Sequence, residues 1–173
     1  ITRFFLRKKY HVICYDNFIY NHLFSVNEFI KNKNYTLIND DLRNLDNLSK
    51  LIDGISDIIL LAGLVGDPIT KKYPKISNEI NLTGIKNFLK ILNKYSFNKL
   101  IFISTCSNYG LINNEIFANE DHPLDPSSLY AKSKVEIENY ILSNSFNLDF
   151  SPVILRFSTA FGLSTRMRFD LTI

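Results

Sequence analysis

The sequence predicts an α/β protein with a doubly wound parallel sheet, because short apolar runs alternate along the chain with segments of helical periodicity. Continuous runs of Ile, Leu and Phe are typical of strands that are buried on both faces of a parallel sheet. Strands are expected at residues 10–16, 35–39, 56–63, 98–105 and 150–157. Helices are expected at residues 1–9, 42–53, 79–95 and 126–144.

The expected elements carry separate local signals. The run YHVICYD is a short apolar run that ends in Asp16, and the runs at 56–63 and 98–105 become continuously apolar. The segment at 42–53 places leucines at helical spacing, and the longer segments after it are amphipathic. Pro126 and the two serines that follow it favour the start of a helix.

Length, composition and charge exclude several classes of protein. The chain has 173 residues, 46% of them hydrophobic, and a net charge of +3 at pH 7, which suits one globular domain. Its basic residues are scattered, as on solvated helix faces, and do not form a nucleic-acid footprint. No apolar run approaches the about 20 residues that span a membrane, and no signal-peptide pattern is present. We therefore expect a cytoplasmic protein that binds neither nucleic acid nor membranes.

The cysteines and histidines predict neither disulfides nor a metal site. Cys14 and Cys106 lie in apolar, strand-like runs, so we expect reduced and buried thiols. The histidines are isolated from one another and from the cysteines, and no cluster has the spacing of metal ligands.

Polar residues gather where the expected strands end. A parallel α/β sheet binds its ligand at the carboxyl ends of its strands. These ends supply Asp16, Asp40 with Asp41, Ala62 with Gly63, and Ser104 with Thr105. A ligand site is therefore expected at that edge of the sheet.

A Tyr-x-x-x-Lys pattern occurs twice, in two different settings. Tyr130 and Lys134 lie four residues apart within the helix expected at 126–144, so they share a helix face. Tyr95 and Lys99 straddle the end of a helix and the start of a strand, so they share no face. Only the first pair is expected to act together.

Several short patterns occur in a characteristic order. They read VICYDN, NDDLRN, LLAGLVG, INLTG, and ISTCSNYG followed by YAKSK. In this order and spacing, the chain resembles the extended short-chain dehydrogenase/reductases, the NAD-dependent sugar-nucleotide epimerase/dehydratase family. The resemblance covers nearly the whole chain and implies a Rossmann fold, NAD as cofactor and a nucleotide sugar as substrate.

The resemblance assigns roles to particular residues. It implies contact with the cofactor for Asp16, Asn17, Asp41, Leu42, Leu61, Ala62, Gly63, Asn81, Ser104, Tyr130 and Lys134. It implies catalytic roles for Thr105, Tyr130 and Lys134. Asp16 would accept from the adenosine ribose hydroxyls, which favours NAD over NADP because a carboxylate repels a 2′-phosphate.

These roles make chemical sense together. A free tyrosine has a pKa of about 10 and is a poor base at neutral pH, but a nearby ammonium favours the phenolate. Tyr130, next to Lys134, would take a proton from a sugar hydroxyl while the adjacent carbon gives hydride to NAD. Thr105 would hydrogen-bond the reacting oxygen. The expected activity is that of an NAD-dependent nucleotide-sugar epimerase or a related oxidoreductase.

Other interpretations stay open at this point. The 4,6-dehydratases of the family carry an Asp-Glu pair directly after the active-site threonine, whereas Cys106 and Ser107 stand there in this chain. A dehydratase with other acid/base residues and a non-catalytic or truncated dinucleotide-binding protein are the alternatives. By residue type alone, Thr105 could be a strand-end hydroxyl and Asp16 a turn residue.

One family feature is missing from the sequence. None of the six glycines forms the Gly-x-x-Gly-x-x-Gly loop that cradles a pyrophosphate. Residues 1–173 are therefore expected to be a partial NAD(P)-binding Rossmann domain, without its first strand and most of its C-terminal substrate region. That strand would lie between those at 10–16 and 56–63, so both should face a gap with unpaired backbone groups. We expect these residues alone to bind NAD weakly and to be unstable.

Smaller departures leave the substrate open. Leu60 stands where the family often has His, and Thr159 stands where its epimerases often have Asn. Arg166 and Arg168 could contact a diphosphate or simply lie on the surface. The resemblance also implies a homodimer formed by the expected helices at 79–95 and 126–144.

Overall fold

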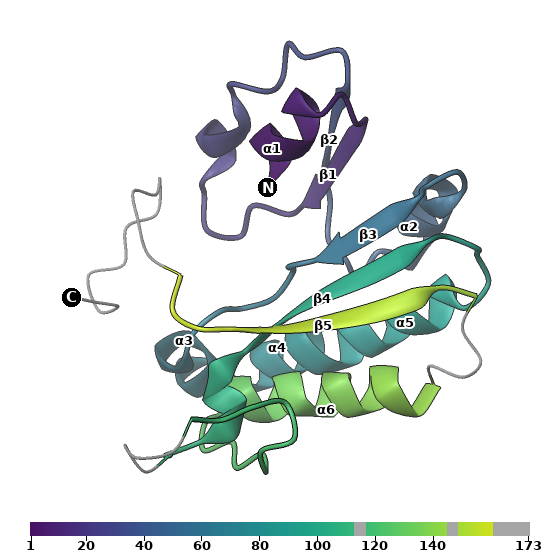
Figure 1. The fold of residues 1–173 in the computed structure, drawn as a ribbon. Helices are drawn as coiled ribbons and strands as arrows, with labels where there is room; N and C mark the ends of the chain where they lie inside the picture. Colours follow the sequence, from purple (N-terminus) through teal and green to yellow (C-terminus); the bar gives the residue numbers. More distant parts are fainter. Residues whose placement is uncertain (113–116, 145–148, 161–173) are drawn as a thin grey trace. The chain divides into compact units, whose positions relative to one another are not determined.

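The computed structural model describes residues 1–112, 117–144 and 149–160. These residues divide into two compact units, Ile1–Asn44 and Leu45–Ala160. Each unit contains its own parallel sheet (Figure 1).

The first unit pairs two strands and two short helices. Its elements are α1 (Thr2–Arg7), β1 (Val12–Asp16), the 3-10 helix η1 (Leu23–Val26) and β2 (Tyr35–Asn39). β1 and β2 are parallel, and their register places Asp16 beside Asn39. The carboxyl ends of both strands therefore reach one edge of this small sheet, as the sequence predicted.

The second unit holds the three remaining strands, β3 (Asp57–Leu60), β4 (Lys99–Thr105) and β5 (Ser151–Phe157), in the order β3-β4-β5. Its helices are α2 (Leu45–Ile52), α3 (Asp67–Lys72), α4 (Pro74–Asn78), the π-helix η2 (Glu79–Gly84), α5 (Ile85–Leu92), the 3-10 helix η3 (Cys106–Tyr109) and α6 (Leu129–Asn144). All strand pairs are parallel.

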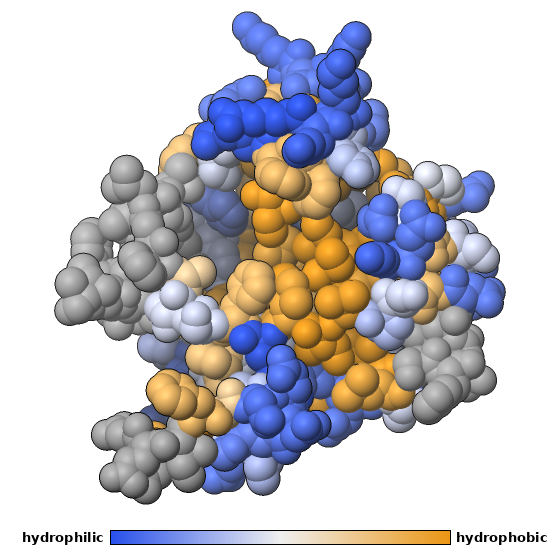
Figure 2. All heavy atoms as spheres, viewed as in Figure 1, coloured by the Kyte–Doolittle hydropathy of each residue, from blue (hydrophilic) through white to orange (hydrophobic). Residues whose placement is uncertain are grey.

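Alternate residues of β4 show where the core lies. Leu100 and Phe102 are buried towards the face along which α5 and α6 run (Figure 1). Ile101 and Ile103 point to the opposite face and are half-buried. Val153 of β5 pairs with Ile101 and is also half-buried, and Figure 2 shows an apolar area over this sheet. Burial of Ile85, Leu92, Phe102 and Ile137 between the sheet and its helices anchors the unit.

Among the described residues, each of the five predicted strands is present and every strand pair is parallel, with shifts at the strand ends. β3 stops at Leu60 although the apolar run continues to Ala62. The helix expected at 79–95 begins as the π-helix η2 and ends at Leu92. The helix expected from residue 126 begins at Leu129, because Ser128 Oγ accepts a 3.1 Å hydrogen bond from the backbone N–H of Ala131.

Four of the described strands, β1, β2, β3 and β5, lie at the edge of a sheet, and two of these edges bear on the sequence prediction. Among the described residues, β1 pairs with β2 alone and β3 pairs with β4 alone. β1 and β3 are the strands that the sequence predicted to face a gap. In both, one row of backbone N–H and C=O groups has no strand to bond.

The cysteine prediction is partly wrong. Cys14 is half-buried in β1, but Cys106 is exposed, because it opens η3 after the buried strand has ended. Among the residues that the structure describes, no helix is long and apolar enough to cross a membrane.

Candidate active site

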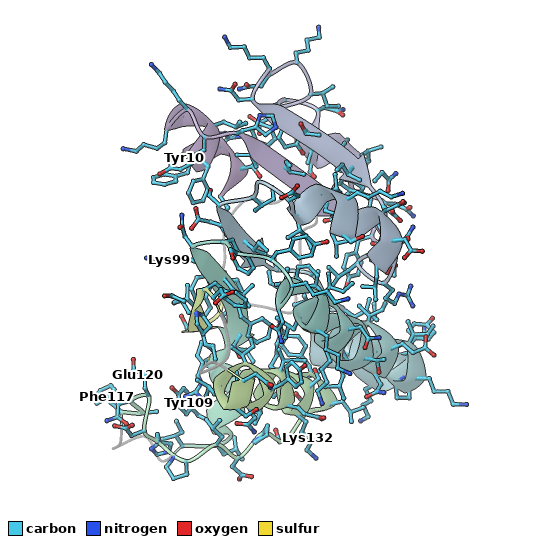
Figure 3. All side chains as sticks on the ribbon, turned by 90° about the vertical axis from the view of Figure 1, so that its right-hand side faces the viewer. Tyr10, Lys99, Tyr109, Phe117, Glu120 and Lys132 are labelled. Atoms are coloured by element: carbon cyan, nitrogen blue, oxygen red, sulfur yellow. The ribbon has the colours of Figure 1, made fainter. Side chains whose placement is uncertain are left out.

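The tyrosine and lysine of YAKSK lie on one face of α6. The Lys134 ammonium lies 5.7 Å from the centre of the Tyr130 ring. The second pair behaves as predicted: Tyr95 lies beyond the end of α5 and donates a 3.1 Å hydrogen bond to the Ser49 carbonyl, and Lys99 begins β4 (Figure 3). Only Tyr130 and Lys134 share a helix face.

Lys134 is a buried cation. Its side chain is 5% exposed, and Nζ donates a 2.8 Å hydrogen bond to the backbone carbonyl of Ile103 in β4. Nζ also lies 4.6 Å from the centre of the Phe102 ring. Burial lowers the pKa of Lys134 to about 8, and the negative charge of Glu138 opposes this lowering. The lysine is therefore mainly charged at neutral pH but loses its proton more easily than a surface lysine.

Thr105 ends β4 and caps the short helix that follows. Its Oγ1 accepts a 3.2 Å hydrogen bond from the backbone N–H of Ser107 and donates one of 3.2 Å to Ser107 Oγ. These contacts orient the hydroxyl group. Thr105 is half-buried and lies at the carboxyl end of β4, two residues after Ile103, whose carbonyl Lys134 contacts.

Ser104 has its hydroxyl on the buried side of the strand. Ser104 Oγ donates to Glu138 Oε1 and accepts a 3.0 Å hydrogen bond from Asn108 Nδ2. The residue is 3% exposed. Its predicted contact with a cofactor stays a prediction, and its backbone is better placed for such a contact than its hydroxyl.

The loop after β3 is held by Asn81 of η2. Asn81 Oδ1 accepts a 2.7 Å hydrogen bond from the Leu64 N–H, and Asn81 Nδ2 donates one of 2.9 Å to the Leu64 carbonyl. Gly63 has φ +150, and a Cβ there would lie 2.9 Å from Asn81 Oδ1. Leu61 is 50% exposed and Ala62 is half-buried. Asn81 thus shapes the loop at 61–64, on which three of the predicted cofactor contacts lie.

In the first unit, the predicted cofactor residues form a cluster at the ends of β1 and β2. Asp16 Oδ1 accepts a 2.7 Å hydrogen bond from the Phe18 N–H. Asn17 Nδ2 donates a 2.7 Å bond to Asp41 Oδ2, and Arg43 donates bonds of 2.8 and 2.9 Å to the same carboxylate. The Arg43 hydrogen bonds hold the pKa of Asp41 well below its usual value.

This cluster fits the ribose end of a dinucleotide. Asp16 Oδ2 makes no hydrogen bond with any described residue, so one carboxylate oxygen is left to accept from ribose hydroxyls. The Asp41 carboxylate, in contrast, is saturated by Arg43 and Asn17, and Leu42 beside it is half-buried. Asp41 therefore maintains the loop, and a contact with adenine would come from the neighbouring apolar surface.

Nearly the whole chain matches a known protein family. Residues 1–172 match the model described as the NAD dependent epimerase/dehydratase family. The chain belongs to this family. The predicted family, the fold class and NAD as the family's cofactor are confirmed.

Individual relatives are epimerases by name. A 4-epimerase of Escherichia coli O157:H7 that acts on N-acetyl-α-D-glucosaminyl-diphospho-ditrans,octacis-undecaprenol is 29% identical over 73% of this chain and 38% of its own length. A UDP-glucose 4-epimerase of Cyamopsis tetragonoloba is 31% identical over 57% of this chain and 28% of its own. The UDP-glucuronic acid 4-epimerase of Bacillus cereus, solved with UDP-glucuronic acid and NAD, has a TM-score of 0.79 and 27% identity over 86% of this chain and 48% of that chain.

This family member spans less than half the length of each of these three proteins. The range that matches the family model includes Thr105, Tyr130 and Lys134. Arg166 and Arg168 lie outside the described residues.

The sequence did not predict the residues beneath the site. Glu138, Asn108 and Arg156 form a buried polar cluster that includes Ser104. Charged residues are rarely fully buried, so a pattern of apolar and polar residues places Glu138 on the solvent face of its helix. The available signal was its spacing, because Glu138 follows Lys134 by four residues, as Lys134 follows Tyr130.

Proposed function

We propose that the complete gene product is an NAD-dependent 4-epimerase of a UDP-sugar. The observation that carries this proposal is the Tyr130–Lys134 pair: a phenol lies 5.7 Å from a buried ammonium that is itself fixed to β4. The named activities of the relatives support the reaction and the substrate class.

The chain's own residues would work as follows. The charge of Lys134 favours the Tyr130 phenolate, which can then take the proton of a sugar hydroxyl at neutral pH. Thr105 would turn its hydroxyl from Ser107 Oγ to the reacting oxygen and hold it in place. Tyr130 would return the proton at the end of the reaction, so the site gains and loses no proton overall.

NAD, when bound, supplies the acceptor for the sugar's hydride and gives it back. Asp16 would hold its adenosine ribose, Lys134 its second ribose, and the backbone at 61–63 would lie against it. Asn17, Asp41, Leu42, Asn81 and Ser104 would support these contacts from the surrounding loops and strand.

The dehydratase alternative has less support. Cys106 and Ser107 occupy the two positions after Thr105, both are exposed, and neither can replace a carboxylic acid pair. The non-catalytic alternative is decided by experiment.

The test is Tyr130→Phe in the complete gene product. An epimerase should lose at least about 100-fold in kcat on UDP-glucose, UDP-N-acetylglucosamine or UDP-glucuronic acid while still binding NAD. Tyr95→Phe is the matched control, because it removes the hydroxyl of the other Tyr-x-x-x-Lys pattern and should leave kcat unchanged. Equal kcat in Tyr130→Phe and wild type, or the absence of turnover with every diphosphate-linked sugar, would count against the proposal.

We also infer a homodimer formed by α5 and α6 and a cytoplasmic location. On α6, Leu129 and Leu142 are 49% and 52% exposed, which leaves apolar surface for a partner subunit. Sedimentation equilibrium of wild type and of Leu142→Lys tests the dimer, since a charge in that interface should shift the mass to that of a monomer.

A further inference from the structure

Glu138 is a buried carboxylate one helical turn beyond Lys134. It is 0% exposed, and it accepts hydrogen bonds from four donors on three different elements. Ser104 Oγ donates from β4, and Asn108 Nδ2 donates a 2.7 Å bond from η3. Arg156 of β5 binds both carboxylate oxygens, because Nε donates to Glu138 Oε1 at 3.2 Å and Nη2 donates to Oε2 at 2.7 Å.

Arg156 extends the cluster towards the surface. Its Nη1 donates a 3.1 Å hydrogen bond to Tyr109 Oη and one of 3.3 Å to the Glu120 carbonyl. Its guanidinium lies 5.2 Å from the centre of the Tyr109 ring. Figure 3 shows Tyr109 and Glu120 on the same side of the second unit. The cluster thus joins β4, η3, β5 and α6 directly behind Thr105.

Stability alone does not explain this arrangement. A buried ion pair pays a desolvation cost that often equals its Coulomb gain, and an apolar pair of the same size is frequently as stable. The positions beside Glu138 on α6, Ile137 and Ile141, are apolar and buried, so an apolar residue could fill this space too. The stability of the fold therefore does not account for the charge of Glu138.

Within the candidate site, the group on which the charge of Glu138 can act is Lys134. The two residues lie at i and i+4 on α6, so their side chains share a face. We propose that Glu138 is a positioning residue for Lys134: with Arg156 as its counter-ion, it keeps the lysine charged and holds the end of β4 against α6. The importance of this effect for catalysis rests on the proposed function. The effect of Glu138 on the charge of Lys134 does not.

The direction of the effect follows from the charges. Burial lowers the pKa of Lys134 to about 8, and Glu138 limits that lowering. Without the carboxylate, the favourable charge is lost and the Arg156 cation that it pairs with is left uncompensated, so the charged form of Lys134 is less favoured. Without the guanidinium, the carboxylate would attract that proton more strongly.

The other groups around Lys134 leave Glu138 as the main compensating charge. Tyr130 faces it from α6, and β4 offers the Ile103 carbonyl and the Phe102 ring. The titratable residues of η3 are Cys106, which is exposed, and Tyr109, which contacts Arg156. Lys86 of α5 is paired with Glu136, 2.6 Å away. The remaining charged residues on the helices packed against α6 are exposed: Asp67, Lys71, Lys72, Lys75, Glu79 and Lys90.

The test measures the titration of Lys134 directly, by NMR of lysine labelled at Cε in the cofactor-free protein, with Lys134→Met to assign the signal. In wild type we expect a midpoint of about 8. In Glu138→Gln the midpoint should fall by about one pH unit or more, and in Arg156→Met it should rise. The double variant should return close to wild type, because both charges are gone. Glu136→Gln is the matched control and should not move the midpoint.

The pH profile of kcat gives an independent reading. Its alkaline limb should move down in Glu138→Gln and up in Arg156→Met. Losses of kcat in both variants with no movement of the limb or of the NMR midpoint would mean a merely structural role and would overturn the inference. NMR shifts as expected in a protein that epimerises no sugar would uphold the role of Glu138 and reject the proposed function.

Folding of the variants is checked by circular dichroism. If Glu138→Gln does not fold, Arg156→Met and Arg156→Lys carry the test. Arg156→Lys retains the cation and should leave the Lys134 midpoint near wild type, whereas Arg156→Met should raise it. Equal midpoints in these two variants would contradict the proposal.

Discussion

Lys134 Nζ donates a 2.8 Å hydrogen bond to the backbone carbonyl of Ile103, which links helix α6 to strand β4. The same lysine has a role in the proposed reaction. Burying the ammonium for this contact costs desolvation free energy. Lys134 therefore combines a structural contact with an electrostatic penalty, and the two can be separated experimentally.

Replacing Lys134 by Met should abolish turnover without lowering stability at neutral pH. The folded-state pKa of about 8 lies below the ordinary value of 10.5, so between these values the unfolded chain binds more protons than the folded one. The free-energy penalty of burying the charged lysine is complete below about pH 8 and disappears as the pH rises towards 10.5. Its upper limit is about 3 kcal/mol. Wild type should therefore gain stability relative to Lys134→Met across this window.

The measurement is urea unfolding of both proteins at several pH values without added cofactor. Lys132→Met is the control, because Lys132 lies on the same helix and is exposed (Figure 3). A difference between wild type and Lys134→Met that does not change with pH would contradict the buried-cation interpretation.

Gly63→Ala should destabilise the protein by about 2–4 kcal/mol. The added Cβ would meet Asn81 Oδ1 at 2.9 Å, and φ +150 is strained for any residue with a side chain. The clash pushes Asn81 away from Leu64 and leaves buried backbone groups unpaired.

Gly54→Ala is the matched comparison. Its φ is +80, but nothing lies within 4 Å of the added Cβ, so backbone strain alone should cost about 1 kcal/mol. Denaturant unfolding gives both values. Equal losses would show that the contact between Gly63 and Asn81 has no energetic weight.

Asp41→Asn should make the protein less sensitive to acid. Hydrogen bonds from Arg43 lower the folded-state pKa of Asp41, so its stabilising contribution is present above the ordinary carboxyl pKa and is lost as the pH falls towards the lowered value. The site is partly exposed, so the contribution is small. Melting temperatures of wild type, Asp41→Asn and the exposed control Asp53→Asn, at neutral pH and at about pH 3, provide the measurement. An equal acid-induced drop in all three proteins would argue against a role for Asp41.

Much of the fold could be predicted from the sequence, because its strands are continuous runs of Ile, Leu and Phe. The end of β3 could not, since Leu61 and Ala62 extend the apolar run and only the loop held by Asn81 shows that the strand has finished. The π-helix η2 was also invisible, because one extra residue per turn hardly changes the spacing of apolar side chains.

Some residues of the candidate site could also be predicted from the sequence, and others could not. Tyr130 and Lys134 could be paired from their spacing because both lie on one helix. Glu138 and Arg156 could not, since they meet across α6 and β5 and each is a charged residue whose usual place is the surface. Contacts between distant elements require the three-dimensional structure.

The open edges of β1 and β3 have a consequence for handling these 173 residues. A strand with a free row of backbone groups can recruit an identical strand from another molecule, and β3 reads DIIL with only its first residue charged. Concentrated preparations of this segment alone should therefore self-associate through β-structure and bind amyloid dyes.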